Sequence, residues 1–323
     1  MKKGDTMQPT RFFRLEKYRL GIAALAMVLF APPPLMLHAA KTQPSSEALV
    51  RVRQTGTFRV GYYSDAGPFS YQDEKGNPAG YAVALCQEIA NDLKAQLGLS
   101  SLNVEFVLVT GEDRFDAVTQ GRVDLLCGPS VETFARRKQV SFSIPIFLGG
   151  LGAMMRADAP AQVRDVLSGR EPPDRPLWRA SIGLALHKRT FSAVTNTTSL
   201  SWLTGKLDEF KLDAKVVPVD SHAAGVQRVL NRSSDVLFGE RSLLLNERKL
   251  NPSAGDLIVL DRFFTYEPLA FALGRSDEDF RLFVDQSLSR LSRSGATQAL
   301  YKQFFGEPDE NTLSFFRLNM VGE

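Results

Sequence analysis

Apolar and polar positions in the first half of the chain follow two different periods. Three short runs predict strands, at residues 56–63, 103–109 and 123–128. The second alternates between apolar and polar residues, and the third has the polarity of a buried strand. Between the first two runs, apolar residues recur at spacings of three and four from Val83 to Leu97, which predicts one buried face of a helix. A shorter helix is predicted at 114–121. The order strand, helix, strand, helix, strand is typical of an α/β layer with a mostly parallel sheet.

A second set of elements follows an uncharged, glycine-containing stretch at 141–155, which predicts an extended crossover. Beyond a polar, proline-rich surface loop, the sequence predicts strands at 180–186, 214–219 and 234–239 and a helix at 222–231. Residues 265–274 predict a second extended crossover. Two amphipathic helices are predicted near the end of the chain, at 277–295 and 296–306.

Residues 1–40 have the three-part pattern of a secretory signal peptide. Basic side chains precede an uncharged apolar run, and the segment ends in the small residues Ala39 and Ala40. A membrane anchor is the alternative, but the run is short for a bilayer and the prolines at 32–34 oppose a spanning helix. We therefore expect residues 1–40 to be a signal peptide for export, with Met1 or Met7 as the start.

Removal of this leader changes the charge of the chain. The whole sequence carries 39 basic and 36 acidic residues, whereas residues 41–323 carry 33 and 34, a net charge of −1. A basic nucleic-acid-binding protein is therefore not expected. Cys86 and Cys127 both lie in the exported part, where an even number favours one disulfide over two buried thiols. His187 and His222 are not at metal-ligand spacing, so no metal site is expected.

Residues 127–142 read CGPSVETFARRKQVSF and concentrate a cysteine, hydroxyl residues and basic residues directly after the strand at 123–128. A basic surface patch, a reactive thiol and one wall of a pocket for a small anion are the possible interpretations. Ligands of parallel α/β sheets bind at the carboxyl ends of the strands, which is where this segment is expected.

A family resemblance lies in two stretches, GTFRVGYYSDAGPFSYQDEKGNPAGYAVALCQEIA (56–90) and GRVDLLCGPSVETFARRKQVSFSIPIF (121–147). They resemble the family 3 periplasmic solute-binding proteins of polar amino-acid ABC importers, most closely the glutamate/aspartate branch. The resemblance covers the chain after the leader and implies the type II periplasmic-binding-protein fold, two α/β lobes joined by two hinge strands. Lobe 1 is then expected at 50–146 plus 270–323. Lobe 2, with the hinge crossovers, is expected at 147–269.

The resemblance also implies a binding site for a small zwitterion. Arg136 stands where the family's arginine grips the ligand α-carboxylate, a bidentate contact that lysine cannot copy. The other ligand contacts that the resemblance implies are Ser130 and Thr133 beside that arginine, Phe69 where the family packs an aromatic ring, Asp65 on the same loop, Thr190 in lobe 2, and Glu240 in place of the aspartate that holds the ammonium. The alternatives are a core aromatic for Phe69, a surface ion pair with Arg241 for Glu240, and a solvated basic run for residues 136–138.

Three positions depart from the family pattern. Ala84 replaces an aspartate, Val131 a frequent hydroxyl residue, and Arg189 a glycine. These departures put the ligand in doubt more than the fold. An added cation favours a ligand with a second anionic group, such as an acidic side chain. The same departures also fit a protein that no longer binds an ordinary amino acid.

The expected function is a periplasmic receptor that captures a small amino acid, with acidic ones among the candidates, and delivers it to an ABC permease of the inner membrane. It is expected to be a monomer without a cofactor or nucleic-acid partner. In the resembling branch the cysteines at 86 and 127 occur together, which implies a disulfide. A sensory solute-binding protein is one alternative. An enzyme like the cyclohexadienyl dehydratases is another, but its candidate acids and bases, Asp65, Glu240 and His187, form no recognisable constellation.

Overall fold

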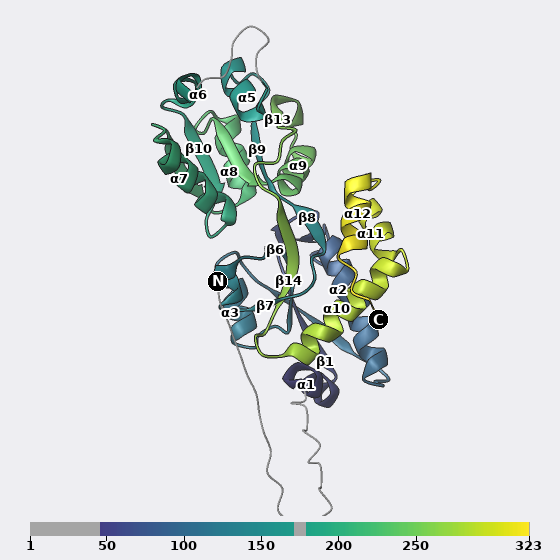
Figure 1. Ribbon diagram of the computed structural model, residues 1–323. Coiled ribbons are helices and arrows are strands. Elements are labelled where there is room, and N and C mark those ends of the chain that lie inside the picture. Colours follow the sequence, from purple (N-terminus) through teal and green to yellow (C-terminus); the bar gives the residue numbers. More distant parts are fainter. Residues whose placement is uncertain (1–45, 171–178, 323) are drawn as a thin grey trace, which may run out of the picture. The chain divides into compact units, whose positions relative to one another are not determined.

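The computed structural model describes residues 46–170 and 179–322, so the predicted signal peptide lies outside the described residues. Figure 1 shows two α/β layers within this part of the chain. The first sheet has the strand order β5-β1-β6-β14-β7, and β8 also pairs with β14. Its strands are β1 (Thr57–Tyr62), β5 (Asn103–Leu108), β6 (Leu125–Val131), β7 (Ser141–Phe142), β8 (Phe147–Gly149) and β14 (Glu267–Leu273).

Strand directions in the first sheet are mixed. β1 runs parallel to β5 and β6, as the sequence predicts, whereas β14 is antiparallel to β6, β7 and β8. β14 lies between β6 and β7, with Leu269 as the register partner of Val131. A strand from the C-terminal third of the chain therefore completes a sheet that the N-terminal half begins.

Helices cover both faces of this sheet. One face carries α1 (Glu47–Thr55), α2 (Tyr81–Gln96), α10 (Glu278–Arg293) and α11 (Ala296–Phe305), and the other carries α3 (Arg114–Thr119). In α2 the positions Val83, Cys86, Ala90 and Leu93 are buried, as their spacing predicts. Each fully buried Leu or Phe in such a core contributes about 1.5–3 kcal/mol.

The second sheet has the order β11-β10-β12-β9-β13. Its strands are β9 (Leu151–Arg156), β10 (Thr190–Val194), β11 (Lys215–Val219), β12 (Val236–Glu240) and β13 (Leu257–Val259). Helices α5 (Ala161–Ser168), α6 (Arg179–Leu186) and α7 (Thr198–Phe210) pack on one face, and α8 (His222–Leu230) and α9 (Arg241–Leu250) on the other. The predicted strand at 180–186 is wrong, because that run is helix α6 and the strand is β10. A short apolar run cannot be told from a helix by periodicity alone.

Two connections join the sheets, which confirms the predicted two-lobed α/β fold. The chain leaves the first sheet between β8 and β9 and returns between β13 and β14. At Gly150 the two connections touch, since a Cβ there would overlap the carbonyl oxygen of Thr265. Only glycine fits this close approach of backbones.

The disulfide between Cys86 and Cys127 is confirmed. It ties α2 to β6, and both residues are fully buried. Neither sulfur is therefore available as a nucleophile, and the reactive-thiol interpretation of residues 127–142 is wrong.

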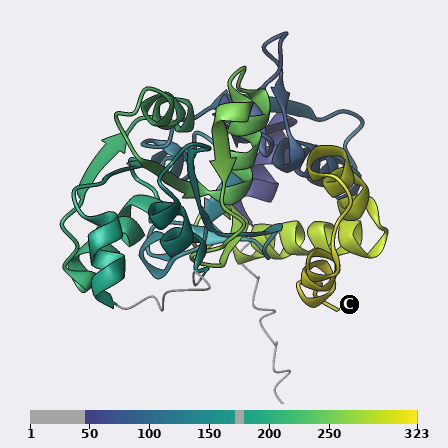
Figure 2. The ribbon, with the colours of Figure 1, turned by 90° about the horizontal axis from the view of Figure 1, so that it is seen from above.

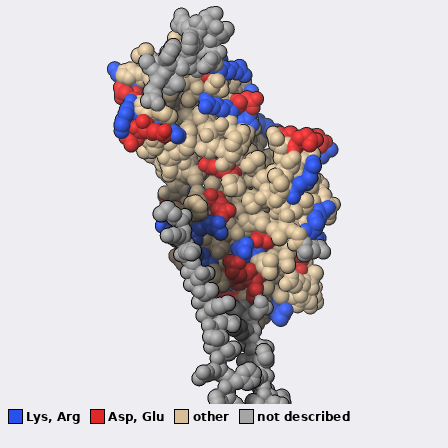
Figure 3. Space-filling view, in the orientation of Figure 1, with Lys and Arg blue, Asp and Glu red and all other residues tan. Residues whose placement is uncertain are grey.

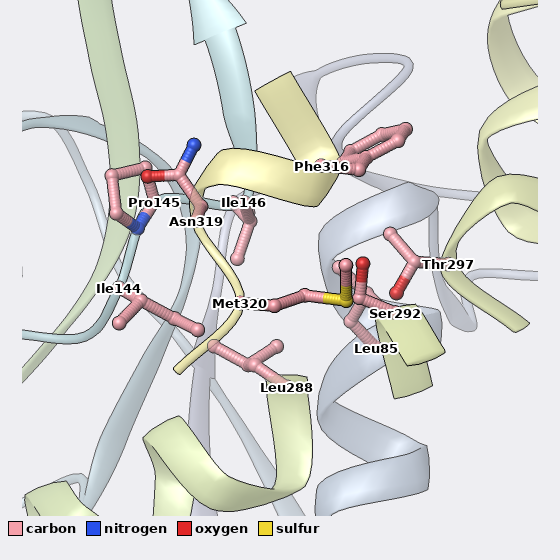
Figure 4. Close-up of a pocket in the computed structure, with 10 residues that line it drawn as sticks. All are labelled: Leu85, Ile144, Pro145, Ile146, Leu288, Ser292, Thr297, Phe316, Asn319 and Met320. Atoms are coloured by element: carbon pink, nitrogen blue, oxygen red, sulfur yellow. The ribbon is translucent and has the colours of Figure 1, made fainter. Parts of the chain in front are cut away.

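The C-terminal helices α10, α11 and α12 (Glu310–Leu318) lie together and are yellow in Figures 1 and 2. Phe316 of α12 is buried, with its ring centroid 5.7 Å from that of Tyr301 in α11. Beyond α12, Met320 reaches toward Leu85 and Ser292 in Figure 4, where a cavity of about 20 Å³ remains. This cavity has room for about one water, so it is not a ligand site.

The remaining elements are short. They are β2 (Asp65–Ala66), β3 (Ser70–Gln72) and β4 (Pro78–Ala79), which form a small antiparallel sheet, α4 (Phe134–Arg137), and the 3-10 turn Ala254–Asp256. Within residues 46–170 and 179–322, no helix combines the length and the apolar character that crossing a membrane would require.

Candidate functional site

A buried and a half-buried arginine lie side by side next to the carboxyl end of β6. Arg114 begins α3 and is 8% exposed, and Arg136 belongs to α4. Their guanidinium carbons lie 4.7 Å and 5.4 Å from the same ring centroid, that of Phe115. Burial, and then the charge of Arg114, lowers the pKa of Arg136 to about 10. Each cation therefore disfavours the other.

Backbone carbonyls, not carboxylates, accept the hydrogen bonds of both guanidiniums. Arg136 Nη1 donates to the Val131 carbonyl at 2.7 Å, and Arg114 Nη1 donates to the Gly111 carbonyl. The Nη2 atoms of Arg114 and Arg136 both donate to the Asn196 carbonyl, at 2.9 and 3.5 Å. Among the described residues, no carboxylate forms an ion pair with either arginine. Charges buried in this way require a counter-charge, so the cluster is suited to an anion.

The loop after β6 fixes the position of Arg136. Thr133 caps α4, and its Oγ1 accepts a hydrogen bond from the Arg136 backbone N–H at 3.2 Å. Ser130 is buried beside Tyr63, and its hydroxyl has no hydrogen bond of good geometry in the described part of the chain. The Tyr63 ring lies against Gly128, where any Cβ would overlap it. Sequence reasoning therefore placed Ser130, Thr133 and Arg136 together correctly in space.

Tyr63 lies between this loop and the two cations. Burial raises the pKa of Tyr63, while the charges of Arg114 and Arg136 act in the opposite direction. Asp65 in β2 is exposed, and its charge also raises the pKa of Tyr63, so it lies at the edge of the cluster. A neutral phenol and a peripheral carboxylate thus surround the two guanidiniums.

The second sheet contributes the segment between β10 and α7 to the opposite side of the cluster. Asn196 has a left-handed backbone, with φ of 58°. Thr197 caps α7, accepting from the Leu200 N–H at 3.3 Å, and Thr198 Oγ1 donates to Glu267 at 3.0 Å. The charge of Glu267 raises the pKa of Arg136, against the larger effect of burial. Residues of both sheets therefore meet at the arginines.

Arg114, Tyr63 and Asn196 were missed by sequence reasoning. Arg114 follows β5 at the carboxyl end of a parallel strand, which is a position that could have been searched. Its contact with Asn196 spans 82 residues of sequence and leaves no local signal.

The structure does not bring Thr190 to the arginine cluster. Thr190 begins β10, and its N–H donates to Asp235 at 2.8 Å, so it lies at the other end of this strand from Asn196. Arg189 pairs with the same carboxylate at 3.1 Å. The alignment of Thr190 followed from the wrong strand at 180–186. With the strand at 190–194, the loop that faces the cluster is 195–198.

Phe69 and Glu240 are also placed away from the two guanidiniums. Phe69 has no exposed surface and packs its ring 4.9 Å from that of Phe147, as the core alternative holds. Glu240 caps α9, accepting from the Leu243 N–H at 2.9 Å and from the Gly150 N–H at 3.5 Å. Burial raises the pKa of Glu240 to about 7. The surface-pair alternative for Glu240 is therefore not what the structure shows.

A groove of about 1070 Å³ lies on the side of α9, α11 and α12. Its lining includes Phe147, Tyr266 and Tyr301, but none of the arginine cluster. The groove lacks buried, unpaired charge, so the arginine cluster is the stronger candidate site.

The histidines show no catalytic arrangement. His187 pairs with the exposed Asp213 at 3.2 Å, and burial lowers the pKa of His222 to about 4. Across residues 46–170 and 179–322, no three His, Cys, Asp or Glu side chains are placed to hold a metal ion. On the face shown in Figure 3, basic and acidic side chains are interspersed, unlike the basic stripe of a nucleic-acid-binding surface.

Comparison with known proteins finds a matching protein family. The model of the bacterial extracellular solute-binding proteins, family 3, matches residues 58–307. The L-glutamate/L-aspartate-binding protein of Pseudomonas aeruginosa is 24% identical over 296 residues, covering 91% of this chain and 89% of the relative. The glutamate/aspartate import solute-binding protein of Escherichia coli is 21% identical over 264 residues, covering 82% of this chain and 81% of the relative.

Solved structures share the fold. An ancestral amino acid-binding protein, a precursor of cyclohexadienyl dehydratase, aligns with a TM-score of 0.63 and 24% identity, covering 80% of this chain and 98% of its own. The cysteine-binding protein of Campylobacter jejuni aligns with a TM-score of 0.64 and 22% identity, covering 81% and 95%.

Proposed function

Because the chain belongs to the bacterial extracellular solute-binding proteins of family 3, we propose that it is a periplasmic receptor that captures an amino acid with an acidic side chain. The observation that carries this proposal is the pair of buried Arg114 and half-buried Arg136, which forms no ion pair with a carboxylate in the described part of the chain. The curated relatives named for glutamate and aspartate support the same ligand class.

Charge balance favours a dicarboxylic amino acid over a neutral one. One guanidinium takes the α-carboxylate through a bidentate contact, as proposed for Arg136, and the other takes the side-chain carboxylate. Each hydrogen bond to a charged group contributes about 1.5–3 kcal/mol. A ligand with one carboxylate leaves the second buried cation uncompensated. Ser130 and Thr133 add hydroxyl groups beside Arg136.

The ligand ammonium needs a carboxylate, and two residues are candidates. Glu267 lies close enough for its charge to act on Arg136, and it accepts from the hydroxyls of Thr198 and Thr265 at 3.0 and 3.1 Å. Glu240 is the sequence-based candidate, but it caps α9. Comparing Glu267→Gln with Glu240→Gln separates them, because only the residue that holds the ammonium weakens the binding of every α-amino acid.

Capture then proceeds by closure of two lobes. We assign lobe 1 to residues 50–146 plus 270–323 and lobe 2 to 147–269, with hinges at the two crossovers. The arginines belong to the first sheet and the segment between β10 and α7 to the second, so a ligand between them links the lobes and favours the closed form. The close approach of Gly150 and Thr265 holds the two hinge segments together.

Partner and location follow from the same role. Residues 1–40 would direct the chain to the periplasm, and an ABC permease of the inner membrane would receive the ligand. The receptor is proposed to act as a monomer without a cofactor and not as an enzyme. Asp65, Glu240 and His187 are not joined by any hydrogen bond or ion pair in the described residues, so no observation favours a dehydratase.

Calorimetry and thermal unfolding of the exported chain test the proposal. L-glutamate or L-aspartate should bind and raise the melting temperature, as any ligand of the native state does, while L-glutamine and L-arginine should bind more weakly. Arg136→Lys should lose affinity for all of them, because lysine cannot reproduce the bidentate contact. A wild-type protein that binds the neutral amino acids as tightly as the acidic ones would contradict the two-cation argument.

A further inference from the structure

The carbonyl of Asn196 occupies the donors that a ligand carboxylate would need. Nη2 of Arg114 donates to it at 2.9 Å and Nη2 of Arg136 at 3.5 Å. The arginines follow strands of the first sheet and Asn196 follows β10 of the second, so these bonds run from one lobe to the other. An acceptor built into the protein thus competes for the same two guanidiniums.

The local backbone geometry directs the Asn196 carbonyl toward the two arginines. Asn196 has φ of 58°, in the left-handed region that asparagine tolerates better than most residues. On one side, Thr195 N–H donates to the Val219 carbonyl at 2.9 Å. On the other, Thr197 Oγ1 donates to the Val194 carbonyl at 2.6 Å and caps α7. Hydrogen bonds therefore fix the turn at both ends, and they hold the Asn196 carbonyl in its direction toward the arginines.

We propose that the Asn196 carbonyl is an internal competitor of the ligand, a latch that holds the lobes together and is displaced when a carboxylate enters. The identity of the displacing ligand rests on the proposed function, whereas the contact between the lobes does not. A charged acceptor forms a hydrogen bond roughly twice as strong as a neutral carbonyl, so a carboxylate wins the exchange. The apparent affinity is reduced by the fraction of molecules in which the latch is closed.

A second contact supports the same segment. Thr198 Oγ1 donates to Glu267 of β14 at 3.0 Å, two residues beyond Asn196. Glu267 in turn lies near Arg136. The latch therefore includes an acceptor for the cations and an anchor on the first sheet. Ligand entry has to break the first and can leave the second in place.

Asn196→Val tests the latch because a β-branched residue is strongly disfavoured at positive φ, which turns the carbonyl away. Spin labels at Lys94→Cys in α2 and Lys215→Cys in β11 report the distance between lobes by double electron–electron resonance. Without amino acid, Asn196→Val should shift the distance distribution away from that of the wild type. Its dissociation constant for L-glutamate should fall by about fivefold or more. The left-handed backbone costs such a residue about 1–2 kcal/mol, and every 1.4 kcal/mol corresponds to a factor of ten in the dissociation constant.

Two control variants separate the effect of the Asn196 carbonyl from that of backbone strain elsewhere and from that of the Asn196 side chain. Lys211, with φ of 51°, ends α7, so Lys211→Val places the same strain at the opposite end of that helix and should leave the distance distribution unchanged. Asn196→Gly keeps the left-handed backbone and should also retain the wild-type distribution. Circular dichroism checks that each variant is folded.

Three outcomes would overturn the latch. One is a wild-type distance distribution in folded Asn196→Val. Another is a changed distribution with weaker binding of L-glutamate, since the carbonyl would then assist the ligand and not compete with it. The third is a changed distribution in Asn196→Gly, which would assign the effect to the side chain. If the wild type binds no acidic amino acid, the proposed function fails, while the distance measurement still decides on the latch.

Discussion

Replacing Arg114 by glutamine should raise the stability of the protein and at the same time weaken its binding of acidic amino acids. The two effects have one cause, the positive charge that Arg114 adds beside Arg136. In the free protein neither of these neighbouring cations forms an ion pair with a carboxylate in the described part of the chain, whereas the proposed complex uses both. Glutamine keeps one hydrogen-bond donor for the nearby carbonyls and removes only the charge.

The magnitude follows from the pKa of Arg136, lowered from 12.5 to about 10. This shift corresponds to roughly 3 kcal/mol at 1.36 kcal/mol per unit. Burial is the larger cause and Arg114 the second, so relief of the repulsion is on the order of 1 kcal/mol. For a chain of this size, that raises the melting temperature by about 2–4 °C. Loss of a charge-assisted bond to the ligand costs about 1.5–3 kcal/mol, a 10- to 150-fold weaker affinity for L-glutamate.

Calorimetry and thermal unfolding of Arg114→Gln measure both quantities. Arg122→Gln is the matched control, because Arg122 is a nearby arginine with an exposed ion pair to Asp113. Its effect should stay within about 0.5 kcal/mol. A lower melting temperature together with unchanged L-glutamate affinity would refute the reasoning, since Arg114 would then support the fold through its carbonyl bonds and not serve an anion.

Three other perturbations have clear expected results. Burial raises the pKa of Glu240 from 4.5 to about 7, so the folded state binds this proton more tightly than the unfolded state does. The resulting stabilisation is lost as the pH rises from 4.5 to 7. The melting temperatures of Glu240→Gln at pH 5 and pH 8 should therefore differ less than those of the wild type. Breaking the Cys86–Cys127 bond with reductant should cost about 2–4 kcal/mol in denaturant unfolding, and the double alanine variant should not respond to reductant. Gly150→Ala should destabilise by about 1–3 kcal/mol, whereas Gly183→Ala, in α6 with open space around it, should not.

Local patterns in the sequence were sufficient for most of the first sheet. The runs at 56–63, 103–109 and 123–128 predicted β1, β5 and β6, and the spacing from Val83 to Leu93 predicted the buried face of α2. Arg136 was identified through the family resemblance of residues 121–147, and the Thr133 that lies three residues before it caps its helix. Such features depend on neighbours within one turn or one strand.

Features that depend on distant contacts were not predictable. Arg114 looks like any polar residue at the start of a short helix until Arg136 and Asn196 are placed beside it. The run at 180–186 has the composition of a buried strand, yet it forms α6, so the loop that faces the arginines contains Asn196 and not Thr190. Glu240 was expected to contact a ligand, but it ends β12 and caps α9, and its carboxylate accepts a hydrogen bond from the Leu243 N–H of that helix.

The position of β14 between β6 and β7 has a consequence for the synthesis of the protein. Leu269 pairs with Val131, so the first sheet stays incomplete until more than four fifths of the chain has emerged from the ribosome. The second sheet, which lies entirely between these strands in sequence, can form earlier. Long-range pairing of this kind slows folding. Any truncation before β14 therefore leaves β6 as an exposed edge that invites aggregation.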